Sequence, residues 1–239
     1  MNTLIAQGLA QLGLTGRIPP EAPETLARYG ALLLEKNQVM NLTALTQPEQ
    51  VARLHMLDCA ALLCLPGVDF AGKRVIDVGT GAGFPGLVLQ LLSPAARVTL
   101  LDSLKKRLDW LGEIAPLLGA DNLTILHARA EEQALAPGWR DSFDLAVSRA
   151  VAPLELLCEL CLPYVAVGGY FLAMKAVDCA GECARAARGI EKLGGALRPS
   201  WDYDIPGAGI THRVVVIEKI SPTPKGYPRR WAKIQKAPL

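Results

Sequence analysis

The spacing of apolar residues changes along the chain near Arg74. Before that point, apolar residues recur three and four positions apart over residues 22–36 and 48–65, which predicts two amphipathic helices. The polar stretch 37–46 between them predicts a loop. We therefore expect residues 1–70 to form an N-terminal helical extension that packs on the main domain.

From Arg74 onward, short apolar runs typical of buried strands alternate with helical segments. This alternation predicts an α/β domain with a mostly parallel, doubly wound sheet, which we place in residues 71–239. Strands are expected at 75–78, 97–101, 123–126, 143–147, 170–174 and 214–217, and helices at 85–92, 104–118, 153–164 and 178–193.

The composition is that of a globular protein, with 51% apolar residues, 20% charged residues and a net charge of +2. Residues 1–14 lack the basic segment and long apolar core of a signal peptide, and no apolar run is long enough for a membrane span. We therefore expect a cytoplasmic protein with reduced cysteines and no membrane partner. We also expect a monomer. The spacing of four cysteines permits a zinc site; these are Cys158, Cys161, Cys179 and Cys183. Their apolar helical context favours core packing, so we expect no metal.

The segment with the most chemical information is Asp77-Val78-Gly79-Thr80-Gly81-Ala82-Gly83-Phe84-Pro85-Gly86. A buried strand runs into three glycines at alternate positions, and a helix follows at once. Glycine tolerates positive φ and lets a ligand approach the backbone closely. In a doubly wound sheet, the carboxyl end of a central strand is the expected ligand crevice. The pattern therefore predicts a ligand site at this loop.

Two acidic residues bear on which ligand binds there. The run Gly81–Gly86 also fits the dinucleotide fingerprint, so a nicotinamide-dependent oxidoreductase is one alternative, and a purely structural glycine turn is another. Asp77 lies inside the strand, where its carboxylate is expected to repel a pyrophosphate and attract the ammonium of a methionine moiety. Asp102 ends the next strand and can accept hydrogen bonds from two ribose hydroxyls, which suits either ligand. We favour S-adenosyl-L-methionine as the cofactor.

Further candidates lie at the ends of the third and fourth predicted strands. Ala130 and Glu131 are placed to hold an adenine through its exocyclic amine, although a solvated glutamate at a helix start is the simpler alternative. Arg149 is expected to line the cofactor pocket, with RNA contact as a second role. Arg129 is a candidate for RNA contact, and a solvated arginine is an equally weighted alternative.

The C-terminal segment has six basic residues from Lys219 onward and no acidic one. Aromatic side chains are interleaved with them, so the segment can combine phosphate pairing with stacking. A basic terminus is more often a solvated, frayed end. Lys225, Arg229, Arg230 and Lys233 are the candidates for RNA contact in this segment.

Together these segments resemble the ribosomal RNA small subunit methyltransferase G family, also called the glucose-inhibited division protein B family. The resemblance spans nearly the whole chain. Besides the glycine segment, it is carried by Asn41-Leu42-Thr43, His55-Met56-Leu57-Asp58, Leu101-Asp102-Ser103, Arg129-Ala130-Glu131, Ser148-Arg149-Ala150, Lys175 and Tyr227-Pro228-Arg229-Arg230.

The resemblance implies a Rossmann-like class I S-adenosylmethionine-dependent methyltransferase with a seven-stranded sheet. It implies 7-methylguanosine in bacterial 16S ribosomal RNA as the product, and that RNA or the small ribosomal subunit as the partner. Carried onto this chain, the cofactor residues would be Gly79, Phe84, Asp102, Ala130, Glu131 and Arg149, beside which the loop itself adds Asp77 and Gly81.

Methylation of guanine N7 fits what the sequence lacks. N7 carries an in-plane lone pair and no proton, so no general base is required and positioning can supply most of the catalysis. Arg149 and Arg129 are the positioning candidates. The fourth strand is followed neither by an Asn/Asp-Pro-Pro-aromatic motif nor by Pro-Cys, which agrees with an N7 acceptor. Methylation of a protein or small molecule, and RNA binding without catalysis, stay open as alternatives.

Overall fold

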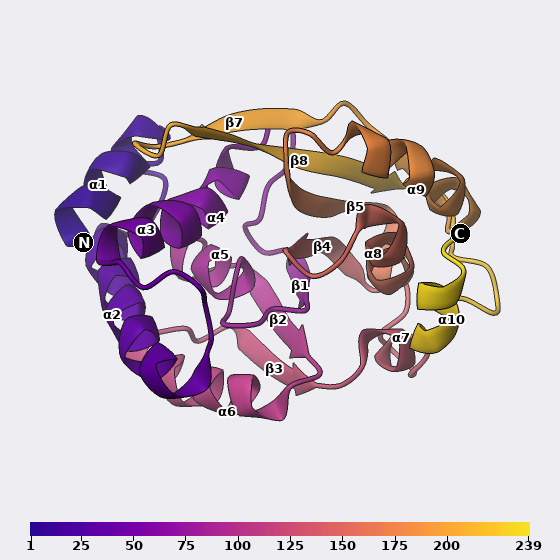
Figure 1. The fold of residues 1–239 in the computed structure, drawn as a ribbon, viewed down its shortest axis with the longest axis horizontal. Helices are drawn as coiled ribbons and strands as arrows, with labels where there is room; N and C mark the ends of the chain where they lie inside the picture. The colour runs from indigo at the N-terminus through magenta and orange to yellow at the C-terminus, as the bar shows by residue number, and fades with distance from the viewer.

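A single twisted sheet runs through the centre of the molecule in the computed structural model, which describes residues 1–239 (Figure 1). The strand order is β3-β2-β1-β4-β5-β8-β6, and β7 also pairs with β8. Pairing is parallel from β3 through β5, whereas β8 is antiparallel to β5. The strands are β1 (Arg74–Val78), β2 (Arg97–Asp102), β3 (Leu123–His127), β4 (Phe143–Arg149), β5 (Val165–Ala176), β6 (Gly195–Leu197), β7 (Trp201–Ile205) and β8 (Ile210–Lys219).

The sheet therefore has eight strands rather than the seven that the resemblance implied. The difference lies at one edge. Both β6 and β7 pair with β8, the first with residues 217–219 and the second with residues 210–214. Two short strands thus share the position beside β8. The predicted α/β class is confirmed.

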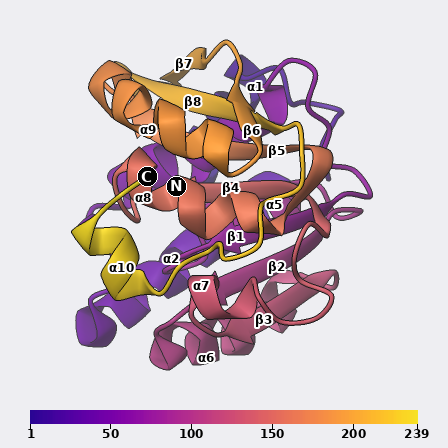
Figure 2. The same cartoon turned by 90° about the vertical axis from the view of Figure 1, so that its right-hand side faces the viewer.

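Helices cover both faces of the sheet (Figures 1 and 2). One apolar core joins the N-terminal helices, α5 and α6 to one face, and a second core joins α7 to α10 to the other. The helices are α1 (Asn2–Gln11), α2 (Ala22–Met40), α3 (Pro48–Val51), α4 (Asp58–Ala60), α5 (Gly86–Leu92), α6 (Lys105–Ile114), α7 (Ala130–Gln133), α8 (Leu154–Cys161), α9 (Ala180–Lys192) and α10 (Trp231–Lys236). None of them combines the length and apolarity that crossing a bilayer requires.

The N-terminal extension differs in detail from its prediction. Helix α2 continues to Met40, four residues past the expected end, and Asn41 closes it in a left-handed conformation. The predicted helix 48–65 is interrupted by a π-helical turn over Ala52–Leu57. Such turns leave backbone groups free for other partners, and they occur often at functional sites.

Candidate cofactor site

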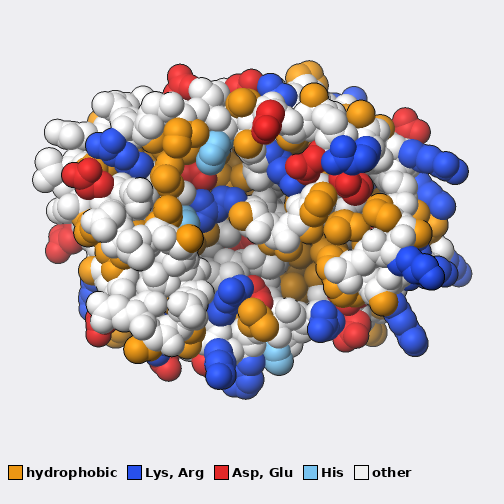
Figure 3. Space-filling model, in the orientation of Figure 1, with side chains coloured by type: hydrophobic (Ala, Val, Ile, Leu, Met, Phe, Trp, Pro, Cys, Tyr) orange, Lys and Arg blue, Asp and Glu red, His pale blue; other side chains and the backbone are white.

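A cleft of about 550 Å³ opens at the carboxyl ends of β1 to β4. This is the place where doubly wound sheets bind ligands, and the volume is typical of a small-molecule site. Figure 3 shows a hollow on this face with basic side chains around its rim. Side chains from both ends of the chain line it, among them His55 and Trp231.

The glycine loop forms the floor of the cleft. Gly79 has φ of 76°, and a Cβ added there would lie 2.6 Å from a methyl carbon of Val151. The backbone N–H groups of Gly79 and Thr80 both donate to the carbonyl of Leu101, at 2.9 and 3.0 Å. Only glycine fits at position 79, since it alone combines that conformation with that approach.

Asp77 occupies a different place from the one predicted. Its side chain is fully buried and does not line the cleft. Its Oδ2 accepts hydrogen bonds from the Thr80 hydroxyl at 2.6 Å and from the Gly86 N–H at 2.8 Å, and its Oδ1 has no partner. Burial raises the pKa of Asp77 to about 7, against the opposing effect of those hydrogen bonds. The structure thus corrects the ammonium-facing role: Asp77 ties the glycine loop to the first turn of α5.

Asp102 lies at the cleft as predicted, with only 6% of its surface exposed. Its Oδ2 accepts from the Gly81 N–H at 2.9 Å, and its Oδ1 accepts from the Leu104 N–H at 2.8 Å. Each carboxylate oxygen has a further lone pair, so both can still accept a ribose hydroxyl. Asp102 therefore fixes the glycine loop and presents an acceptor to the ligand.

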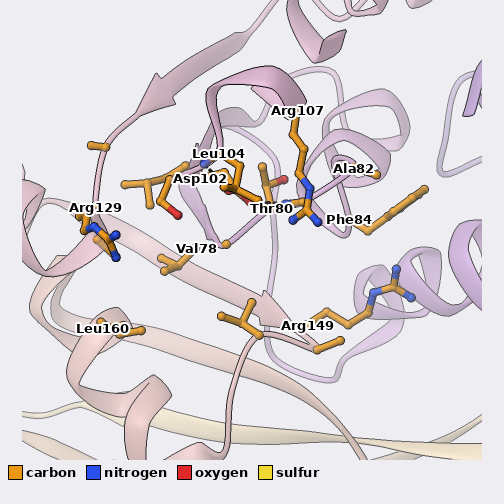
Figure 4. A pocket seen from close by; sticks show the side chains of 18 of the residues that line it. Val78, Thr80, Ala82, Phe84, Asp102, Leu104, Arg107, Arg129, Arg149 and Leu160 are labelled. Atoms are coloured by element: carbon orange, nitrogen blue, oxygen red, sulfur yellow. Dashed lines mark hydrogen bonds between the residues drawn. The ribbon is translucent and has the colours of Figure 1, made fainter. Parts of the chain in front are cut away.

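Ala130 and Glu131 also line the cleft, in the first turn of α7. The carbonyl of Ala130 accepts a hydrogen bond of 2.7 Å from the buried Tyr164 hydroxyl, which fixes this end of the site. Arg129, just before them, is exposed at the rim. Figure 4 shows Arg129 and Arg149 at opposite ends of the cleft, so the two arginines do not act on one ligand group together.

Arg149 leaves the end of β4 and joins the sheet to the helical extension. Its Nη1 donates to the carbonyl of Leu54 at 2.8 Å and to Asp58 Oδ2 at 3.1 Å, and its Nη2 donates to His55 Nδ1 at 2.8 Å. The guanidinium also lies 5.1 Å from the ring centroid of Phe84, within range of a cation–π contact. Because a guanidinium has five N–H donors and three are used here, two remain for a ligand.

Asp58 fixes the position of the Arg149 guanidinium. It is fully buried, and its Oδ1 accepts from the Tyr203 hydroxyl and from His212 Nδ1, each at 2.8 Å. Burial alone would raise the pKa of Asp58, but the hydrogen bond from His212 and the charge of Arg149 outweigh it and hold the pKa below its usual value. Asp58 is therefore ionised at neutral pH and joins the extension to β4, β7 and β8.

His55 and two aromatic residues complete this wall. Because Arg149 can only donate, His55 Nδ1 is the acceptor, and its Nε2–H donates to the Thr43 hydroxyl at 2.8 Å. Burial and the charge of Arg149 lower the pKa of His55 to about 3, so the ring is neutral. The Phe84 ring stacks on His55 at 4.5 Å and on Tyr29 at 5.2 Å, and the Tyr29 hydroxyl donates to the carbonyl of Ala82. Residues at the contact between the extension and the sheet, His55 and Phe84, thus also line the cleft.

Sequence reasoning missed several residues that line the cleft. Arg107 lies with Nη1 4.0 Å from the Cβ position of Gly81 and points along the glycine loop (Figure 4). Its place on the helix after Asp102 is the only signal in the sequence. Trp231 and Leu42 reach the cleft from opposite ends of the chain, and nothing local predicts either.

The basic tail is only partly free for RNA. Arg229 binds the fully buried Glu159, with Nη2 2.6 Å from Oε2 and Nε 2.8 Å from Oε1. This pairing favours a structural role for Arg229, since freeing the guanidinium for RNA would leave a buried carboxylate unpaired. Lys225, Arg230 and Lys233 are exposed and stay candidates. No group of three or more His, Cys, Asp or Glu side chains is arranged to hold a metal ion.

Comparison with known proteins identifies the family. The profile described as rRNA small subunit methyltransferase G matches residues 22–197. The chain belongs to this family. A relative from Symbiobacterium thermophilum, named ribosomal RNA small subunit methyltransferase G, is 43% identical over 99% of this chain and 97% of its own length. The resemblance predicted from the motifs is confirmed.

Solved structures agree on the fold. TrmN from Thermus thermophilus is 27% identical, with a TM-score of 0.52 over 68% of this chain and 48% of that one. M. jannaschii TYW2 in complex with AdoMet is 17% identical, with a TM-score of 0.50 over 64% of this chain and 72% of that one. The protein is an S-adenosylmethionine-dependent methyltransferase of Rossmann-like fold. The glycine cradle at position 79 and the carboxylate of Asp102 fit that cofactor.

Proposed function

We propose that the protein transfers the methyl group of S-adenosylmethionine to N7 of a guanine in bacterial 16S ribosomal RNA. The observation that carries this proposal is the absence of a free general base where β4 ends. There the Ser148 hydroxyl is bound to the Val78 carbonyl, Arg149 is a permanent cation, and Ala150 and Val151 follow. Guanine N7 needs no deprotonation, whereas a hydroxyl or amine acceptor would need a base within reach.

The nearest titratable groups support this reading, because each already has a fixed role. His55 accepts from Arg149 and is too weak a base, given its lowered pKa. Asp58 is buried beneath it in three hydrogen bonds. Asp77 is buried away from the cleft. Catalysis would then come from holding N7 in line with the methyl group.

The geometry supports one orientation of the cofactor. The ribose hydroxyls would bind Asp102, with the adenine towards Ala130 and Glu131. The methionine end would lie along Gly79, Gly81 and Phe84, where the two free N–H donors of Arg149 suit its carboxylate. When bound, the cofactor supplies the activated methyl group, and the remaining cleft at the end of β4 takes the guanine.

RNA binding is supported by exposed basic residues around the cleft mouth. Arg129 lies on the rim, while Arg230 and Lys233 flank Trp231, which itself lines the cleft. Figure 3 shows several basic side chains at the edge of the hollow on this face. These side chains would attract the phosphate backbone of RNA, with an affinity that falls as salt rises.

The test is methyl transfer from labelled S-adenosylmethionine to unmethylated 16S RNA and to small ribosomal subunits, followed by nucleoside mapping. We expect label only in 7-methylguanosine, at a single position, and none with an Arg149→Ala variant. Label at another atom, or only in protein, would contradict the proposed acceptor. Calorimetry with S-adenosylhomocysteine and NAD addresses the oxidoreductase alternative, for which NAD would have to bind.

A further inference from the structure

The last helix of the chain contributes to the cofactor cleft. Trp231 begins α10 and lines the cleft together with Leu160 of α8 and Ala130 of α7. Its ring is half-buried and packs against the second apolar core. The C-terminal segment, predicted as an RNA-binding arm, therefore also closes the end of the cleft where Ala130 and Glu131 lie.

Strong contacts fix α10 in this position. Glu159 of α8 is fully buried, and it accepts hydrogen bonds from the backbone N–H of Arg229 at 2.7 Å as well as from its guanidinium. Three residues beyond Trp231, Ile234 is fully buried in the same core. The indole thus lies between an ion pair on one side and an apolar anchor on the other.

The chain on either side of α10 is also attached to the body of the protein. Arg140 donates hydrogen bonds to the carbonyls of Thr223, Pro224 and Tyr227. At the end, Leu239 lies against Gly189 of α9, where an added Cβ would come within 2.9 Å of the Leu239 Cβ. Because the C-terminal segment is attached at both ends and in the middle, it forms a fixed part of the cleft lining.

We propose that Trp231, with Leu160, forms the apolar surface against which the adenine ring of the cofactor packs. The inference rests on the cofactor orientation proposed above. In that orientation the polar edge of adenine meets Ala130 and Glu131, so the ring face needs an apolar partner, and Trp231 is the aromatic side chain lining that end. Large, rigid aromatic surfaces are well suited to stacking on nucleobases.

The experiment measures cofactor binding by calorimetry with S-adenosylhomocysteine, without RNA. Trp231→Ala should raise the Kd about five- to 150-fold, the size of one lost base–aromatic contact. Trp231→Phe should stay within about threefold of the wild type, because phenylalanine keeps a stacking face. Gln235→Ala, on an exposed position of the same helix, should leave the Kd unchanged.

A second ligand separates contact with adenine from general loosening of the site. 5′-Methylthioadenosine carries the adenine and ribose but not the amino-acid end, and Trp231→Ala should weaken it by the same factor as S-adenosylhomocysteine. The cofactor-induced change in tryptophan fluorescence should also largely disappear in Trp231→Phe. If the wild type binds and Trp231→Ala binds equally well, or loses affinity only for the longer ligand, this inference fails and methyl transfer to RNA is untouched. Failure of the wild type to methylate RNA would instead count against the proposed function alone.

Discussion

Replacing Asp58 by asparagine should destabilise the protein and weaken the cofactor site together. The carboxylate is fully buried and accepts hydrogen bonds from Arg149, Tyr203 and His212. Asparagine keeps the size and one acceptor oxygen, but it removes the charge and turns a donor towards groups that themselves donate. Arg149, whose side chain is 15% exposed, would lose its counter-charge.

The structure sets the size of the effect. Breaking a buried ion pair by removing one partner costs about 3–5 kcal/mol. For a chain of this length, 1 kcal/mol shifts the unfolding midpoint by about 2–4 °C, so the midpoint should fall by about 6–20 °C. Since the pKa of Asp58 is held below its usual value, its stabilising effect is present above the usual carboxyl range and is lost as pH falls through the folded-state pKa.

Thermal unfolding at pH 7 and calorimetry with S-adenosylhomocysteine measure the two effects. The matched control is Tyr203→Phe, which removes one hydrogen bond to the same carboxylate and should cost about 1.5–3 kcal/mol. We expect Asp58→Asn to be the more damaging change and to raise the Kd, because Arg149 loses its fixed position. An Asp58→Asn protein as stable as the wild type, or no less stable than Tyr203→Phe, would refute the reasoning.

Three further changes test the loop. Burial raises the pKa of Asp77 to about 7, so the contribution of this side chain to the free energy of unfolding is present below the usual carboxyl pKa and is lost as pH rises through 7. The melting temperature of Asp77→Asn should therefore rise relative to that of the wild type between pH 5 and pH 8, and a constant difference would argue against this. Asp102→Ala should weaken S-adenosylhomocysteine binding by about 1–3 kcal/mol in calorimetry, and unchanged affinity would remove Asp102 from the site. Tyr29→Phe leaves the Ala82 carbonyl without its donor and should lower the free energy of unfolding by about 1–3 kcal/mol in denaturant titrations, where no loss would mean that the loop does not depend on it.

Most of the strands that the sequence predicted have apolar residues that the helices on both faces of the sheet bury. Strands β1, β2, β4, β5 and β8 each contain several buried apolar residues, because helices cover both faces of the sheet. In β3 no residue is fully buried, and its apolar residues are only partly covered. The two missed strands lie at the edge. Trp201–Ile205 alternates with exposed aspartates, and Gly195–Leu197 is only three residues long, so neither has the signature of a buried strand.

Strand alternation explains why Asp77 was assigned to the wrong face. Successive side chains of a strand point to opposite faces. Val75 belongs to the core on the α5 side, whereas Ile76 and Val78 belong to the core on the α8 side. Asp77 therefore shares the side of Val75 and meets the start of α5, while Val78 lines the cleft. The period-two rule alone could have indicated this.

The remaining site residues could not be inferred from local pattern, because their partners are distant in sequence. Arg149 binds Asp58 and Arg229 binds Glu159, pairs separated by 91 and 70 positions. Arg149 was predicted mainly for the cofactor pocket and Arg229 for RNA, yet each is held by a buried carboxylate. The sequence alone does not show which arginines the fold pairs in this way; Arg129 and Arg230 are exposed and stay candidates for RNA contact.

The two ends of the chain meet the ligand at opposite ends of one cleft. His55 of the extension and Trp231 of α10 both line it, together with residues at the carboxyl ends of β1 to β4 and in α6, α7 and α8. In the cofactor orientation proposed above, His55 lies towards the methionine end and Trp231 towards the adenine end. The extension also shares one continuous core with the sheet, from Ile5 to Val216. We therefore propose that residues 1–70 are part of the catalytic domain itself. Asp58 of this extension supplies the buried counter-charge of Arg149 in β4, so the site is incomplete without the extension.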